Sequence, residues 1–183
     1  MVNDAQALDT FLAAIEGRAF YMARLGTRND ADALDIVQEA LARFAERYAT
    51  KAADEWKPLF YRVLQTRIAD WHRREFIRSR FFIVFESRKE QTDGHFSETR
   101  PEAPDPGEKS AEDLAATNFF MSELKSALAN LPHRQRQTFL LRAWEGLSVA
   151  ETALAMQCSE GTVKTHYSRA LAVLKTHLEG HGP

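Results

Sequence analysis

Cysteine is nearly absent from this sequence, since Cys158 is the only one in 183 residues. One thiol cannot close an internal disulfide, and a chain without a CxxC pair lacks the usual thiol sites for metals and redox chemistry. Long apolar runs are also missing, because no stretch approaches the roughly 20 residues that span a bilayer. The first ten residues carry acidic groups where a secretory signal would be basic. These absences predict a cytoplasmic chain with no membrane insertion.

Motifs typical of enzymes are likewise missing. The sequence has neither a glycine-rich nucleotide-binding loop nor an HExxH zinc motif. Its six histidines show no ligand spacing with carboxylates or with the cysteine. We therefore expect no catalytic residue, no metal and no cofactor, and a protein that works by binding.

The net charge of -2 averages over segments of opposite sign. Residues 1–50 hold eight acidic groups against five basic ones, whereas residues 61–80 hold six arginines against two acids. Residues 86–113 reverse the sign with nine acids against four bases, and residues 131–183 are mildly basic. This alternation indicates several distinct contact surfaces, of which the basic ones suit nucleic acid.

Helical periodicity dominates the chain, and no stretch alternates in the period-two pattern of a strand. Three helices are predicted in the N-terminal half: two that end near Gly26 and near Tyr48, and a third that runs from about Trp56 to Arg80. Residues 87–113 are rich in proline, glycine and charge, and have little capacity to form a core. We predict an all-α protein with two small helical domains, at 1–85 and 114–183, joined by a flexible acidic linker at 86–113.

The C-terminal half carries clear helix-terminus signals. A helix ends before Pro132, a second runs from about His133 to Trp144, and Gly146 suits a left-handed stop. The next begins with Ser148-Val149-Ala150-Glu151, the pattern of a capping box. After a short break at 156–158, Ser159 can cap the last helix. Two short helices joined by a tight turn predict a helix-turn-helix.

The last helix has an apolar stripe that we expect to be buried, formed by Val163, Tyr167, Ala170, Leu171, Leu174 and Leu178. It also has a polar outer face whose members can donate hydrogen bonds to bases and phosphates. These residues are Thr162, Lys164, Thr165, Ser168 and Arg169. A plain solvated face is the alternative interpretation, but the helix-turn-helix punctuation favours DNA recognition.

Two faces of the N-terminal helices are more ambiguous. Asp35, Gln38, Glu39 and Glu46 form an acidic stripe, which taken alone is more often solubilising than a docking face for a basic helix. Residues 60–80 interleave arginines with aromatic rings, a combination that suits single-stranded or melting nucleic acid. Some of those rings must belong to the core, and Asp70 and Arg74 have the spacing of a surface ion pair.

An aromatic run at residues 81–85 precedes the linker. Its exposure to water would be costly, so either its own domain or a partner must cover it. Packing within its own domain is the simpler interpretation.

Several short motifs occur together in one order: Asp35-Ile36-Val37-Gln38-Glu39, Phe60-Tyr61-Arg62-Val63 with Asp70 and Arg73-Arg74, Leu131-Pro132 through Arg136, Gly161-Thr162-Val163-Lys164, and Arg169-Ala170. Over nearly the whole chain this pattern resembles the extracytoplasmic-function sigma factors, which direct bacterial RNA polymerase to promoters. A transcriptional regulator with a receiver domain is the rival, but the N-terminal half lacks the alternating strands and helices that such a domain requires.

The resemblance implies a role for each surface. Asp35, Gln38 and Glu39 would dock on the clamp helices of core RNA polymerase, while the C-terminal domain would pack on the polymerase flap. The linker would occupy the channel toward the polymerase active site, and an anti-sigma factor is an expected partner. The minus-10 promoter element would be opened by Arg62, Thr66, Arg67, Asp70, Arg73 and Arg74. The minus-35 element would be read by Arg136, Thr162, Lys164, Thr165, Ser168 and Arg169.

Three features depart from the family pattern. The aromatic run at residues 81–85 matches no motif of the family, and a contact with an anti-sigma factor is the alternative to its packing within its own domain. Thr66 stands where the family usually has asparagine, beside the pocket for the flipped promoter base. Gln157 replaces the usual glycine in the turn of the helix-turn-helix. A non-glycine residue in a left-handed conformation is strained but tolerated.

Overall fold

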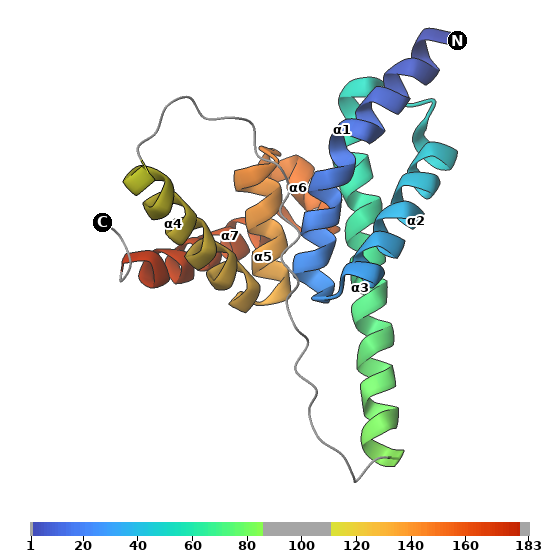
Figure 1. The fold of residues 1–183 in the computed structure, drawn as a ribbon. Coiled ribbons are helices and arrows are strands. Elements are labelled where there is room, and N and C mark those ends of the chain that lie inside the picture. The colour runs from blue at the N-terminus through green and yellow to red at the C-terminus, as the bar shows by residue number, and fades with distance from the viewer. Residues whose placement is uncertain (1, 86–110, 180–183) are drawn as a thin grey trace.

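The computed structural model describes the backbone of residues 2–85 and 111–179, and the side chains of residues 5–78 and 120–179. All regular elements within these ranges are helical, and no strand occurs in them (Figure 1). The predicted all-α fold is therefore confirmed. No helix in the described part of the chain is long and apolar enough to cross a membrane.

The N-terminal bundle consists of α1 (Val2–Thr27), α2 (Asp30–Tyr48) and α3 (Ala53–Phe85). Asn29 caps α2, its side-chain oxygen accepting a hydrogen bond from the Asp32 amide at 3.0 Å. α3 begins earlier than predicted because Asp54 and Glu55 occupy its first turn, where carboxylates favour a helix start. It also continues through residues 81–85, projecting beyond the rest of the bundle (Figure 1).

The C-terminal bundle contains α4 (Ala111–Asn130), α5 (His133–Phe139), α6 (Val149–Met156) and α7 (Glu160–Glu179). A π-helical turn, Leu140–Trp144, extends α5 as far as the predicted end of that helix. The left-handed stop at Gly146 is confirmed by its φ of 69°.

The predicted domain limits stay a prediction, although α4 begins at Ala111, two residues before the proposed end of the linker. Linker residues 86–110 and the side chains of the aromatic run 81–85 lie outside the described residues. What covers that run is therefore also still a prediction.

One contiguous core runs through both bundles. Met22, Phe44 and Phe60 fill its N-terminal part, and Leu140 and Leu141 fill its C-terminal part, all at 2% exposure or less. The bundles meet where α6 packs along α3 (Figure 1). Helix α3 therefore belongs to the N-terminal bundle and also packs against the C-terminal one.

Candidate nucleic-acid interface

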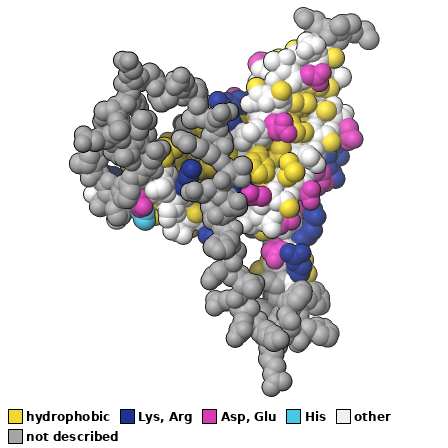
Figure 2. Space-filling model, in the orientation of Figure 1, with side chains coloured by type: hydrophobic (Ala, Val, Ile, Leu, Met, Phe, Trp, Pro, Cys, Tyr) yellow, Lys and Arg dark blue, Asp and Glu magenta, His cyan; other side chains and the backbone are white. Residues whose placement is uncertain are grey.

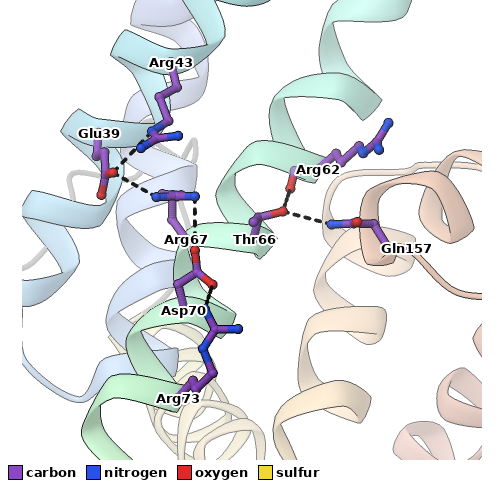
Figure 3. A network of polar contacts seen from close by, with 8 residues as sticks. All are labelled: Glu39, Arg43, Arg62, Thr66, Arg67, Asp70, Arg73 and Gln157. Atoms are coloured by element: carbon purple, nitrogen blue, oxygen red, sulfur yellow. Dashed lines mark hydrogen bonds and ion pairs between the residues drawn. The ribbon is translucent and has the colours of Figure 1, made fainter.

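A chain of ionic contacts links α2 to the arginine-rich face of α3 (Figure 3). One carboxylate oxygen of Glu39 forms ion pairs with the guanidinium groups of Arg67, at 2.9 Å, and Arg43, at 3.3 Å. Arg67 also contacts Asp70 at 3.1 Å, and Asp70 in turn receives Arg73 at 2.9 Å. The structure therefore pairs Asp70 with Arg67 and Arg73, in place of the Arg74 that the sequence indicated.

This network joins one predicted polymerase-binding residue to three predicted minus-10 residues. Its arginines differ in exposure: the side chain of Arg67 is 14% exposed, whereas that of Arg73 is 73% exposed. Arg74 is exposed as well, and Arg62 is half-buried. Arg67 is thus held in place by two carboxylates, while Arg73 and Arg74 can reach an incoming phosphate.

Thr66 lies apart from the ionic network, on the side of α3 that faces α6 (Figure 3). Its hydroxyl donates to the carbonyl of Arg62 at 2.8 Å, one turn earlier. The same oxygen accepts a hydrogen bond from Nε2 of Gln157 at 2.9 Å. Both hydrogen-bonding roles of the hydroxyl are therefore filled.

The aromatic rings of α3 divide between core and surface. Phe60 and Tyr61 are fully buried, Trp71 and His72 are half-buried, and Phe76 is 61% exposed. Burial, with the nearby Glu145 carboxylate, raises the pKa of Tyr61 far above its ordinary value. Phe60 and Tyr61 are thus core residues, which leaves the later rings as the candidates for contact with bases.

The predicted polymerase-binding residues follow the outer face of α2. Asp35 and Gln38 are exposed, and Glu39 is half-buried beside its arginine partners. Next to this face, Ala13, Phe20, Leu34 and Val37 line a shallow hollow of about 340 Å³ between α1 and α2. Figure 2 shows hydrophobic side chains gathered on this bundle, with acidic groups among them.

The polar face of α7 begins at a side-chain cap. Ser159 accepts a hydrogen bond from the amide of Thr162 at 3.2 Å, and the two hydroxyls lie 2.9 Å apart. The structure therefore confirms Ser159 as the cap of this helix. Four further predicted minus-35 residues are exposed on this helix: Lys164, Thr165, Ser168 and Arg169.

The opposite face of α7 packs against the core. Val163, Ala170 and Leu174 are buried, as the helical stripe predicts. Leu171, which the same stripe places inside, is 43% exposed. The buried face is therefore narrower than the apolar pattern indicated.

Unlike the predicted minus-35 residues on α7, Arg136 is buried. It is 5% exposed, and its guanidinium donates to the carbonyl of Ala129 at 3.1 Å, near the end of α4. Desolvation and the nearby Arg28 lower the pKa of Arg136. In this structure Arg136 ties α5 to α4, and its contact with DNA stays a prediction.

Sequence reasoning missed the contacts between the bundles, which we call the interbundle seam. Gln65 donates to Gln137 at 2.9 Å in the buried part of the seam. The Glu145 side chain, fully buried, lies 3.4 Å from Lys57 and 3.6 Å from Arg18.

Aromatic contacts complete the interbundle seam. Trp144 packs edge-on against Tyr21, with ring centroids 4.9 Å apart. The rings of His72 and His133 meet at 4.5 Å. These pairs join segments far apart in the chain, so no local pattern announces them.

Comparison with known proteins places the chain among transcription proteins. Residues 121–174 match the family described as Sigma-70, region 4. An RNA polymerase sigma-E factor of Streptomyces antibioticus is 32% identical over 148 residues, which cover 81% of this chain and 71% of the relative. The ECF RNA polymerase sigma factor SigF of Caulobacter vibrioides is 30% identical over 169 residues, covering 91% and 82%.

Two solved structures share the fold at low sequence identity. The co-crystal structure of the sigma factor RpoE in complex with the anti-sigma factor NepR from Bartonella quintana matches with a TM-score of 0.63 and 20% identity. That match covers 95% of this chain and 98% of RpoE. The structure of CnrH in complex with the cytosolic domain of CnrY matches with a TM-score of 0.59 and 17% identity, covering 99% and 97%.

Proposed function

Because the chain belongs to the extracytoplasmic-function sigma factors of bacterial RNA polymerase, we propose that it reads promoters at two separate surfaces. The α7 face from Thr162 to Arg169 reads the minus-35 element in the major groove, where lysine, arginine and hydroxyl groups can pair with base edges. The arginine face of α3 engages the minus-10 element. The protein acts by binding in the cytoplasm, where it meets polymerase and DNA, and it supplies no catalytic group.

One observation carries this proposal: a capped helix with an exposed polar face and an arginine-rich helix occur in the same chain. A helix-turn-helix alone would account for duplex binding only. Exposed Arg73 and Arg74 add cations beside half-buried Trp71, which suits a strand whose bases are unstacked. Two linked DNA surfaces gain avidity once polymerase holds them together.

Run-off transcription with purified core polymerase tests the proposal directly. We expect the chain to start transcripts from a subset of a promoter library, at sites that share two elements. Sequence-specific DNA binding without initiation on any template would instead indicate a stand-alone regulator.

The polymerase contact of α2 can be tested separately by reversing one charge. We expect Asp35→Lys to weaken binding of core polymerase and to leave binding of minus-35 duplex unchanged, because Asp35 is exposed on the α2 face, away from α7. Binding of labelled core is measured by titration, alongside a duplex titration. Glu39→Lys is the poorer variant because it would set a lysine against Arg67 and Arg43. Equal losses in both titrations would contradict a dedicated polymerase face.

We also propose control by an anti-sigma factor, which would cover the hollow between α1 and α2. Support comes from the shared fold with RpoE, whose structure is a complex with an anti-sigma factor. Leu34, which lines the hollow, is 44% exposed. We expect a small protein to co-purify with the native chain and to be lost from Leu34→Asp but not from Leu154→Asp, an exposed site on the other bundle. Retention by Leu34→Asp would argue against this docking site.

A further inference from the structure

Gln157 holds a backbone conformation that favours glycine. It follows α6 as its C-terminal cap with φ 51° and ψ 50°, in the left-handed region. Glycine adopts this conformation without the steric cost that a Cβ atom brings. A glutamine at this position is therefore suboptimal for the turn itself, and its side chain needs a role elsewhere.

That role is visible across the interbundle seam. The Gln157 amide nitrogen donates to the Thr66 hydroxyl at 2.9 Å, joining residues 91 positions apart. The Thr66 proton is directed to the Arg62 carbonyl, so the hydroxyl oxygen presents its acceptor side to the amide. Thr66 and Gln157 are also two of the three places at which the sequence differs from the pattern of the family it resembles. These two meet in one hydrogen bond.

The position of this bond matters for both proposed DNA surfaces. Thr66 lies in the stretch of α3 proposed to engage the minus-10 element, and Gln157 stands two residues before Ser159, which caps the proposed recognition helix. While the bond is made, the turn of the helix-turn-helix lies against α3 at Thr66 (Figure 3).

The neighbouring contacts of the seam are polar as well, including the Gln65 to Gln137 bond and the charges around Glu145. Polar groups exchange their partners for water when a seam opens, so each such bond contributes a modest net amount. The seam therefore combines these polar contacts with the shared apolar core and the ring pairs, and its opening exchanges both kinds of contact for water.

We propose that Gln157 and Thr66 form a latch that holds the turn of the helix-turn-helix over Thr66, one of the proposed minus-10 positions, while the protein is free. Binding of core polymerase releases the latch and exposes Thr66. This inference rests on the proposed function for the identity of the covered surface, but the latch itself is a property of the chain alone.

Three single variants test the latch. Gln157→Gly removes the hydrogen-bond donor and also the steric cost of the left-handed backbone conformation. Gln157→Asn tolerates the same conformation, but its side chain is too short to reach Thr66. Thr66→Val removes the acceptor. Thr10→Val is the matched control, since Thr10 donates only to its own helix, to the Gln6 carbonyl at 2.8 Å. Spin labels at exposed Glu46 and Thr176, in a Cys158→Ser background, report the distance between the bundles.

We expect each of the three variants to raise the open-to-closed ratio by roughly 2- to 10-fold, the worth of one hydrogen bond, and Thr10→Val to leave it unchanged. The double variant Gln157→Gly/Thr66→Val should open no further than either single variant, because both remove the same bond. Gln157→Gly should also resist urea at least as well as the parent, which separates opening from misfolding. Unchanged distances in the single variants, or additive effects in the double variant, would overturn the latch.

Binding of single-stranded minus-10 DNA to the free protein then separates the two proposals. If the latch covers a DNA surface, the two Gln157 variants bind the strand more tightly than the parent by the same factor as their opening; Thr66→Val is left out of this comparison because Thr66 is itself a proposed minus-10 contact. Variants that open without gaining affinity would show that the latch covers something other than the minus-10 surface. Run-off transcription by the parent tests the sigma function independently of either result.

Discussion

Ser148 and Glu151 show how two side chains fix the start of a helix. The Ser148 hydroxyl accepts from the Glu151 amide at 3.1 Å, and the Glu151 carboxylate accepts from the Ser148 amide at 2.6 Å. Hydrogen bonds from Ser148 lower the pKa of Glu151 below its ordinary value. The capping box was predicted from four consecutive residues because both partners are local, and the structure confirms it.

Removal of this cap should weaken the C-terminal bundle. We expect Ser148→Ala to lower the free energy of unfolding by about 1 kcal/mol, measured by urea denaturation. The loss of stability should shrink as pH falls below 4.5, the ordinary pKa of Glu151. The hydrogen bonds with Ser148 that lower this pKa stabilise the ionised carboxylate, and their contribution disappears when the carboxylate is protonated. Ser168→Ala, at an exposed position within α7, is the control and should change little. A penalty independent of acid pH would mean that Glu151 takes no part.

At the scale of single helices, the sequence predicted what depends on neighbours in the chain. The cap at Ser159 depends on Thr162, three residues away. The left-handed turn at Gln157, in contrast, was expected only from the resemblance to the family. The extent of α3 was less predictable, because neither proline nor glycine follows Arg80 before the linker, and periodicity alone does not mark where such a helix stops. Burial of Arg136 was also missed, since its partner is a backbone carbonyl on another helix.

Helix α7 offers a test of the minus-35 surface through the salt dependence of binding. Each phosphate neutralised by a basic residue adds about 0.9 to the slope of log affinity against log salt. We expect Lys164→Ala to weaken binding of minus-35 duplex and to lower this slope by about 0.9. Lys175→Ala is the matched control, a lysine farther along the same helix that pairs with Glu179 at 3.4 Å. Equal changes in the two variants would argue against a specific contact at Lys164.

At the scale of the whole molecule, the interbundle seam was beyond prediction from one sequence. Gln65 and Gln137 are 72 residues apart, and Lys57 and Glu145 are 88 apart. Isolated polar residues carry no periodic signal that reveals such partners. The family pattern indicated two domains, but their mutual packing depends on contacts between residues far apart in the chain.

The histidine pair makes the seam sensitive to acid. His133 is half-buried beside His72, Arg136 and Arg134, and its desolvation together with these neighbours lowers its pKa to about 3. Burial and Arg136 also lower the pKa of His72. The folded, closed protein therefore keeps both rings neutral, whereas an opened or unfolded chain takes up protons near the ordinary pKa of 6.5.

We therefore expect the free energy of unfolding to be unaffected by this pair above pH 6.5, where both rings are neutral in the folded and the unfolded chain. The free energy of unfolding should fall progressively as pH is lowered from 6.5 toward 3. Urea unfolding of the parent and of His133→Gln across this range measures the effect. The variant should gain stability relative to the parent as pH falls. Parallel pH profiles would show that the pair is not linked to folding.

The core shared through α3 also bears on turnover of the protein. Each bundle alone would be small enough for its core to be marginal, whereas the two together bury a larger fraction of their surface. Proteases attack a chain through states that open locally or globally. A closed sigma factor thus protects its own cleavage sites, and a chain held open without polymerase to cover it would be degraded sooner. We therefore expect packing of both bundles on α3 to slow proteolysis of the free protein.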